Sequence, residues 1–390
     1  MKKLISVVLA LVMMLTASIC ATAAYDKDTK ELSFNADGKF KILQINDTQD
    51  IGNSDERMVA FVKAAIAEVQ PDLVVFNGDQ LSDIYTTPSL SDFTKALDNV
   101  CGACEEAGVP FAATLGNHDH DRCATVPEDE MYSEIYAKYS YCLNYKGYDY
   151  FTFNLPVKSS DGNSVALNVF MMDSNNNDGL NGNTSGYDGV TKDAIEWYEN
   201  TSEALNAANG GEIVPSILFQ HVPVKEIYSL LKRCEWSVDG AIYCRRDGYW
   251  YTVDETKVTD GTLGEAPCSE DFDTITGQYE SWLKEGNIIG AWFAHDHVNS
   301  FSGITEDGIR MGYNGGTGFR AYGNGDGRSV RVFEFDENDV ANYDTYLLTY
   351  GELVEELSFV SSDFLTPVWL NRLMKVVYAL FGWAINLFKD

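Results

Sequence analysis

Short apolar runs alternate with amphipathic stretches through the first third of the chain. Residues 40–45, 73–76 and 110–115 have the length and continuous apolar character of buried strands. Between them, residues 55–69 and 91–107 repeat apolar side chains every three or four positions, which predicts helices with one buried face. Strands and helices that alternate over short links predict a parallel sheet covered by helices.

The same alternation returns in the second half of the chain. Residues 165–172, 213–219 and 287–294 are predicted to form strands, and residues 191–208 a helix. We expect two sheets that face each other across a shared core, which brings the ends of both sets of strands to one rim. The whole α/β unit is expected over residues 30–360.

Polar residues suited to bind metals follow these predicted strands. Asp47, Asp79 and Asn117 lie just past the carboxyl ends of the first three strands, where open α/β sheets bind ligands. The histidines fall in three short segments, each of which also follows a strand. The five histidines of the chain are His118, His120, His221, His295 and His297.

This set of side chains is about what a hydrolytic centre with two metal ions needs. Imidazole and carboxylate groups are the ligands of borderline and hard divalent metals. His295 and His297 are separated by one residue, so in an extended segment both point to the same face. His118 stands beside Asn117, and an unligated histidine next to two cations is suited to protonate a leaving oxygen. A metal-dependent hydrolase is therefore the first hypothesis.

At these positions the chain resembles the calcineurin-like metallophosphoesterases. The pattern of that family is D-x-H, G-D, G-N-H-D/E, a lone His and then G-H-x-H. The matching blocks appear here in the same order, over residues 40–335. They are Asp47-Thr48-Gln49, Gly78-Asp79, Gly116-Asn117-His118-Asp119, His221 and Ala294-His295-Asp296-His297. The segments 186–189 and 318–322 are similar, more loosely, to plant and fungal members labelled purple-acid-phosphatase-like.

The resemblance implies a four-layer α/β/β/α sandwich of two facing mixed sheets, with a dinuclear metal site at the strand-end rim. It also implies two divalent or trivalent ions (Mn, Fe or Zn) and hydrolysis of phosphate mono- or diesters by in-line attack of a metal-bound hydroxide. Asp79 would bridge the ions, and Asn117 and His118 would contact the phosphate. His118 would assist the leaving group, oriented by Asp119. The implied metal ligands are Asp47, Gln49, Asp79, Asn117, His221, His295 and His297.

Three departures from the family pattern leave an alternative open. Gln49 stands where a histidine is usual, and an amide oxygen binds zinc or iron more weakly than imidazole does. Ala294 replaces a glycine. Ser82 occupies the position where purple acid phosphatases have a tyrosine. The alternative is a non-catalytic surface or carbohydrate-binding protein on a decayed phosphoesterase scaffold.

Two further side chains have open roles. His120 lies just past the motif, and it either lines the pocket, approaches the metal near Gln49 or faces water. Arg320 either pairs with the substrate phosphate or is an ordinary surface residue.

The net charge and the N-terminal residues indicate what the protein can bind and where it acts. The net charge of −31 opposes binding to nucleic acid backbones, so no nucleic acid partner is expected. Residues 1–23 have a basic start, an uncharged apolar run and small residues before a cleavage point, which predicts a signal peptide. We therefore expect a secreted or cell-surface protein that acts on a phosphorylated small molecule or an envelope phosphoester. For Cys101 with Cys104, and for Cys234 with Cys244, both a disulfide and free thiols remain open.

Two segments stand apart from the predicted core. Residues 231–271 lack a clear period and are expected to be an inserted loop with a hairpin. Residues 364–390 are rich in apolar side chains and predict an amphipathic helix. That helix either docks on the catalytic domain or lies on a membrane surface, because its uncharged part is too short to span a bilayer.

Overall fold

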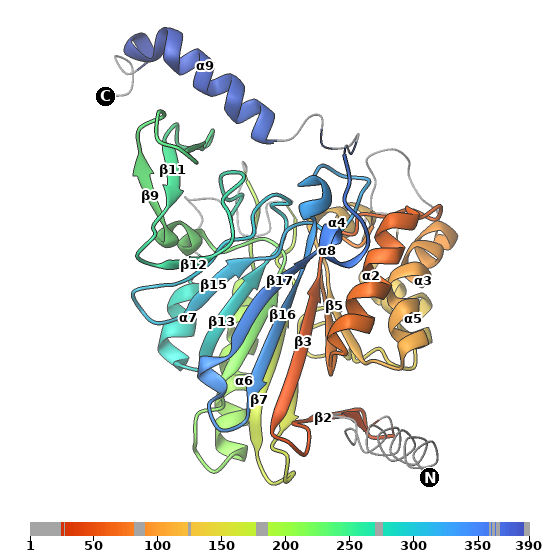
Figure 1. The fold of residues 1–390 in the computed structure, drawn as a ribbon. Coiled ribbons are helices and arrows are strands. Elements are labelled where there is room, and N and C mark those ends of the chain that lie inside the picture. The colour runs from red at the N-terminus through yellow and green to blue at the C-terminus, as the bar shows by residue number, and fades with distance from the viewer. Residues whose placement is uncertain are drawn as a thin grey trace, which may run out of the picture.

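Two β-sheets pack face to face, and helices cover their outer faces (Figure 1). The computed structural model describes residues 25–26, 28–81, 90–123, 126–176, 186–269, 276–358, 360, 363 and 367–385. The predicted signal peptide and Ser82 lie outside these residues. Both sheets contain parallel and antiparallel pairs, so the expected α/β fold with two mixed sheets is confirmed.

The five-stranded sheet carries the first ligand segments. Its parallel strands β3, β4 and β5 come from the first three predicted strands, and β16 joins β3 in antiparallel register. In sheet order its strands are β17 (Asp344–Thr349), β16 (Ser329–Asp336), β3 (Lys39–Ile45), β4 (Leu73–Asn77) and β5 (Phe111–Thr114). The helices near this sheet are α2 (Glu56–Val69), α3 (Leu90–Ala107), α4 (Asn117–Cys123), α5 (Glu128–Glu134) and α8 (Tyr350–Leu353).

The nine-stranded sheet carries the later ligand segments. Strands β7, β8, β13 and β15 run parallel to one another at its centre, with α6 (Lys192–Ala208) and α7 (Gln278–Glu285) outside it. In sheet order its strands are β1 (Tyr25–Asp26), β2 (Glu31–Ser33), β6 (Phe153–Lys158), β7 (Val165–Met172), β8 (Ser216–Gln220), β13 (Ile288–Phe293), β15 (Arg310–Tyr313), β14 (Ser302–Ile304) and β12 (Val258–Asp260).

Alternating side chains of one strand enter two different apolar layers. Leu43 and Ile45 of β3 join the cluster under α2 and α3, whereas Phe40 and Ile42 join the cluster between the two sheets. The period of two follows from the pleat, which sends successive side chains to opposite faces. A third cluster fills the space between the nine-stranded sheet and its helices. This is why strands buried on both faces appear in the sequence as unbroken apolar runs.

A small sheet and the C-terminal helix stand beside this sandwich. The segment expected to be an inserted loop supplies β12 to the nine-stranded sheet and forms three further strands, on which α9 (Pro367–Ile385) packs (Figure 1). In sheet order these strands are β10 (Ile242–Tyr243), β11 (Trp250–Val253) and β9 (Leu231–Cys234). Among the helices of the described residues, none has both the length and the apolar character needed to cross a membrane.

Neither disulfide that the sequence left open is formed. Cys101 and Cys104 are buried free thiols on α3, and burial raises the pKa of both. Cys234 ends β9 and Cys244 follows β10, and β11 lies between those two strands. The free thiols of this second pair are therefore separated by the width of a strand.

Candidate metal centre

The carboxyl ends of strands from both sheets meet at one rim. Asp47 and Gln49 follow β3, Asp79 follows β4, and Asn117 begins α4 after β5. From the other sheet, His221 follows β8, while His295 and His297 follow β13. The structure brings all seven of these predicted ligand residues to this rim.

The backbone is strained at several of these positions. Among the described residues, the non-glycine residues with positive φ are Lys30, Asp47, Gln49, Gln70, Asp79, Asn175 and His295. Four of these seven are predicted metal ligands. A non-glycine residue in this region costs about 1–2 kcal/mol, so the rest of the fold must hold the loops in place. Such strain is typical of a functional site rather than of ordinary strand ends.

Two glycines allow the loops to approach each other closely. A Cβ atom on Gly78, which has a φ of +84°, would lie 2.4 Å from Nδ1 of His221. A Cβ atom on Gly116 would lie 2.2 Å from Oδ1 of Asp79. Any other residue at either position would displace a predicted ligand, which explains why glycine precedes both Asp79 and Asn117.

The donor atoms form two overlapping groups that share one carboxylate. Asp79, His221 and His295 make one group, and Asp47, Asp79 and His297 make the other, with the donor atoms of each group within 4.8 Å of one another. Nε2 of His221 lies 3.3 Å from Oδ2 of Asp79, and Nε2 of His297 lies 3.3 Å from Oδ1 of Asp47. A shared carboxylate between two donor groups is the arrangement that binds two neighbouring cations.

Several buried donor atoms at this rim make no hydrogen bond, although those of Asp47 and His221 lie in ion-pair contacts with His297 and Asp79. Each atom is fully enclosed, and an unpaired buried polar atom costs about 1–3 kcal/mol. These atoms are Oδ1 of Asp47, Oε1 of Gln49, Oδ1 of Asn117 and Nε2 of His221. Four such atoms in one place are explained by cations that they would coordinate, so the residues fit a pair of metal ions.

Contacts on the far side of two imidazoles fix their orientation. Nδ1 of His221 lies 3.0 Å from the carbonyl oxygen of Asn77, and Nδ1 of His297 lies 2.8 Å from that of Tyr322. When Nδ1 donates to a carbonyl, Nε2 is left as the free lone pair that a metal takes. Burial opposes the charged rings, but the neighbouring carboxylates outweigh it and raise the pKa of His221 to about 10 and that of His297 to about 9. Cation binding must therefore displace protons from both rings.

Gln49 occupies the place of the expected histidine. Its Nε2 donates to Oδ2 of Asp79 at 2.9 Å and lies 3.4 Å from Nε2 of His297. A half-turn of the amide would present Oε1 to the same place. The amide can therefore act as an oxygen ligand, and as built it is hydrogen-bonded to the shared carboxylate.

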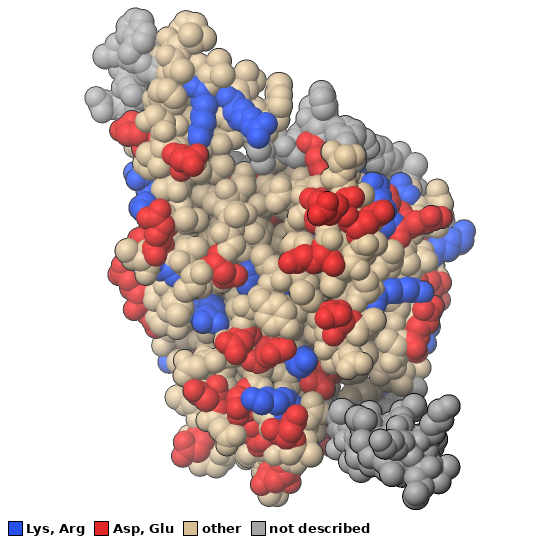
Figure 2. Space-filling model, in the orientation of Figure 1, with Lys and Arg blue, Asp and Glu red and all other residues tan. Residues whose placement is uncertain are grey.

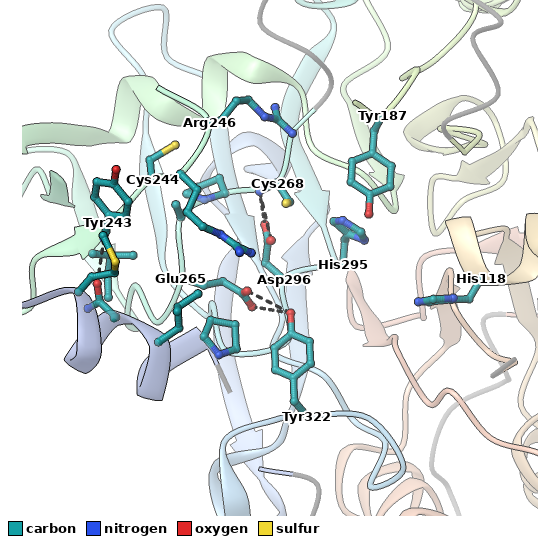
Figure 3. Close-up of a pocket in the computed structure, with 18 residues that line it drawn as sticks. His118, Tyr187, Tyr243, Cys244, Arg246, Glu265, Cys268, His295, Asp296 and Tyr322 are labelled. Atoms are coloured by element: carbon teal, nitrogen blue, oxygen red, sulfur yellow. Dashed lines mark hydrogen bonds between the residues drawn. The ribbon is translucent and has the colours of Figure 1, made fainter. Parts of the chain in front are cut away.

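His118 lies on α4, and its side chain lines a pocket beside the donor groups. Its backbone N–H donates to Oδ1 of Asp79 at 2.9 Å, and the pocket, of about 560 Å³, is also lined by His295. Figure 3 shows both rings on the side of the pocket that lies away from Tyr243 and Cys244. This placement suits a side chain that contacts a substrate held against the donor groups.

The Asp119 carboxylate binds backbone groups of two loops beside the site. It accepts backbone N–H groups of Gly116 at 3.0 Å, Leu81 at 3.0 Å and Gln80 at 3.3 Å. Burial, followed by the charge of Asp79, raises the pKa of Asp119 to about 7. The side chain thus joins the loops after β4 and β5, and that His118 is oriented by Asp119 stays a prediction.

Arg320 and His120, whose roles the sequence left open, both bind carboxylates outside the predicted ligand set. Arg320 donates through Nε to Oδ1 of Asp50 at 2.9 Å and through Nη2 to the carbonyl oxygen of Asn53, so it ties two loops together and is not part of the pocket lining. Nε2 of His120 lies 2.8 Å from Asp173, which removes it from the metal near Gln49. The contacts of Arg320 favour a structural role, and its contact with a substrate phosphate stays a prediction.

The pocket beside His118 contains residues that sequence reasoning missed. Arg245 and Arg246 follow β10 and supply positive charge, and Glu265 accepts hydrogen bonds from the hydroxyl of Tyr322 at 2.9 and 3.0 Å. Burial raises the pKa of Glu265 to about 7. Tyr187 lies against His295 with ring centroids 4.5 Å apart (Figure 3). The only sequence signal for the arginines was a pair of cations inside the aperiodic segment.

Comparison with known proteins agrees with this geometry. The family model for calcineurin-like phosphoesterases matches residues 40–299, and the chain belongs to that family. The chain is 28% identical to the Arabidopsis thaliana protein named "Probable inactive purple acid phosphatase 14", over 82% of this chain and 81% of that one. It is 26% identical to "Probable inactive purple acid phosphatase 28" of the same plant, over 78% and 77% of the two chains. A third Arabidopsis relative, "Probable inactive purple acid phosphatase 29", is 25% identical over 86% and 85%.

Proposed function

We propose that this protein is a phosphoesterase that uses two metal ions to hydrolyse phosphate mono- or diesters. The observation that carries the proposal is the set of buried donor atoms without a hydrogen bond on Asp47, Gln49, Asn117 and His221 around the carboxylate of Asp79. These atoms lie together around one shared carboxylate, which is what a pair of cations would need.

The chain would hold the two ions through both sheets. Asp47, Gln49 and His297 would ligate one ion, and Asn117, His221 and His295 the other, with Asp79 shared. Burial and the neighbouring His221 lower the pKa of His295 to about 3, so this ring is neutral and ready to donate a lone pair. When bound, a pair of cations activates water and neutralises charge on a phosphoryl group.

Residues on the pocket side would handle the substrate. The His118 ring is placed to give a proton to the leaving oxygen, and the Arg245 and Arg246 guanidinium groups offer charge for an anionic substrate. Tyr187 and Tyr322 enclose the space near His295 and His297 and limit the access of bulk water. The tyrosines therefore favour a substrate with an apolar or planar group next to its phosphate.

An activity screen with metal reconstitution tests this function. Purified protein loaded with Mn²⁺, Fe or Zn²⁺ should cleave p-nitrophenyl phosphate or its bis-ester. Asp79→Asn should abolish cleavage, whereas Asp344→Asn, an exposed aspartate on β17, should leave it unchanged. Cleavage at the wild-type rate by Asp79→Asn would refute the proposal.

A second candidate function is a non-catalytic protein on the same scaffold. Gln49 favours it, because its amide is hydrogen-bonded to Asp79 and is a weaker ligand than histidine. The names of the three Arabidopsis relatives point the same way. Elemental analysis separates the two candidates: protein that purifies without metal and takes up none supports the non-catalytic one.

We also propose that the protein acts outside the cytoplasm on a phosphorylated small molecule or an envelope phosphoester. The support is the sequence of residues 1–23, with its basic start, apolar run and small residues. Mass spectrometry of the protein from its native cells should find an amino terminus near residue 24. A full-length protein confined to the cytoplasm would contradict this.

A further inference from the structure

The C-terminal helix has one face docked on the small three-stranded sheet. Asn371 donates through Nδ2 to the carbonyl oxygen of Ala241 at 2.9 Å and accepts the backbone N–H of Tyr243 at 2.9 Å. On the next turns, the ring of Tyr378 packs edge-on against Trp250, with centroids 5.2 Å apart. These contacts fix which face of α9 points away from the protein.

The outward face of α9 is apolar and exposed. Its large side chains are between 44% and 62% exposed, which is more than almost all other large apolar side chains of the described residues. Their spacing of four, three and four residues places the first four on one stripe. The side chains are Trp369, Leu373, Val376, Leu380 and Phe381. A contiguous apolar stripe of this kind marks a surface that is covered in use.

The charge of α9 is opposite to that of the whole protein. The chain has a net charge of −31, yet residues 367–385 contain no Asp or Glu and carry Arg372 and Lys375. Figure 2 shows tan and blue atoms where α9 lies, while red side chains are spread over the body of the molecule. Arg372 is exposed near the stripe, whereas Nζ of Lys375 donates to the carbonyl oxygen of Val238 at 3.4 Å. An apolar stripe with a cation beside it is the pattern of a helix that lies in a bilayer surface.

We propose that this face of α9 rests on a bilayer surface that contains anionic lipids. A second copy of the chain is the competing occupant, and charge argues against it. Two paired α9 helices would bring Arg372 and Lys375 near the same cations of the other copy, with no acid on either helix to balance them. Anionic headgroups complement these cations, and acyl chains accept Trp369 and Phe381 without a shaped partner surface.

Docking on a bilayer would place the pocket beside lipid headgroups. Pro367, Leu370, Asn371 and Met374 of α9 form one wall of the pocket whose far side is His118 and His295. Resting on the proposed function, this geometry favours a phosphoester that is itself held in the membrane surface. The docking itself does not depend on catalysis, so it can be tested without a substrate.

Vesicle binding by the full chain tests the proposal. We expect co-sedimentation with vesicles of equal parts phosphatidylcholine and phosphatidylglycerol to be about tenfold stronger than with phosphatidylcholine alone, as two surface cations predict. Replacing Trp369, Leu373, Val376 and Leu380 by Ser should abolish binding to both. The matched control, Ile304→Ser with Tyr346→Ser, removes exposed apolar side chains outside α9 and should bind as wild type does.

A charge variant keeps the test decisive if the apolar variant fails to fold. Arg372→Glu changes an exposed cation and keeps the docked side chains Asn371 and Tyr378, and it should remove the preference for phosphatidylglycerol. No binding to either vesicle by the wild-type chain overturns the proposal, whatever its phosphatase activity. So does a dimer in solution that is broken by the apolar variant while vesicles are not bound, because the stripe would then be covered by a second copy.

Discussion

The two sheets supply different chemistry to the same rim. The five-stranded sheet contributes the oxygen donors Asp47, Gln49, Asp79 and Asn117. The nine-stranded sheet contributes the nitrogen donors His221, His295 and His297. Each sheet alone carries less than either donor group requires, because both groups combine carboxylates of one sheet with imidazoles of the other. The centre therefore exists only because the sheets pack face to face.

The cost of building the site also differs between the two sides. On the oxygen side Asp47, Gln49 and Asp79 all have positive φ, whereas on the nitrogen side only His295 does among the three ligands. Short oxygen side chains must be aimed by the backbone, while an imidazole reaches further and is held by a hydrogen bond from its second nitrogen. The oxygen donors are therefore positioned by backbone strain, and the imidazole donors by hydrogen bonds to their second ring nitrogen.

Removing a nitrogen donor should have the largest effect. We expect His221→Ala to lose metal and to lower kcat/KM by about 10³-fold or more, because several kcal/mol of charge stabilisation depend on the cations. Asp344→Asn is the control, since this exposed aspartate on β17 lies outside both donor groups. Elemental analysis and kinetics measure both. Equal metal content in the two variants would contradict the division into two donor sides.

The next largest effect is expected at His118, which lies on α4 on the oxygen side. We expect His118→Ala to keep its metal and to lower kcat by about 10²–10⁴-fold, as the loss of a general acid does. The loss should be largest for substrates with poor leaving groups and small for p-nitrophenyl phosphate. A leaving-group series measures this, and a uniform loss across it would show that His118 acts on binding instead.

Gln49→His places a nitrogen donor among the oxygen donors of the five-stranded sheet. We expect Zn²⁺ to bind about tenfold or more tightly, because imidazole is the better ligand for that ion. Calorimetry with Zn²⁺ measures the change. Gln49→Leu should do the opposite and empty one site. Unchanged affinity in both variants would mean that position 49 is not a ligand.

The smallest expected effect is on the free energy of unfolding, and it comes from Glu128 at a second contact between the two sides. Glu128 of α5 lies near His120 and Asp173, and burial, followed by the charge of Asp173, raises its pKa to about 7. A carboxyl whose folded pKa is raised costs stability once it ionises, so the protein should lose stability as pH rises from about 4.5 to 7. Glu128→Gln should remove this loss and stabilise the protein by about 1 kcal/mol at pH 8, the partly exposed side chain being screened by solvent.

Urea unfolding at pH 5 and pH 8 checks this last prediction. The difference between Glu128→Gln and the wild type should appear at pH 8 and be absent near pH 4.5. The same difference at both values would show that the substitution acts through packing. The exposed Glu255→Gln, whose side chain pairs with Lys232 at the surface, is the matched control and should change little.

Much of the donor set could be predicted because its signals are local. A buried strand that ends at Asp47, Asp79 or His221 fixes where that side chain lies, since parallel strands end at one edge of a sheet. The contacts of Asp119 and Arg320 could not be predicted in the same way. Their partners, the backbone of Leu81 and the carboxylate of Asp50, are set by how separate loops cross. Sequence spacing carries no record of such crossings.

The strands and helices expected from the sequence, and the residue types at the rim, are properties of short segments, because the hydrophobic period and the strand-end motifs are local. The packing of distant segments decided instead how the oxygen and nitrogen donors come within reach of one another, that Arg245 and Arg246 enter the pocket, and that α9 shows an apolar face outward. Each of these depends on contacts between segments far apart in the chain. Such contacts arise only when the sheets, the inserted strands and the last helix pack together.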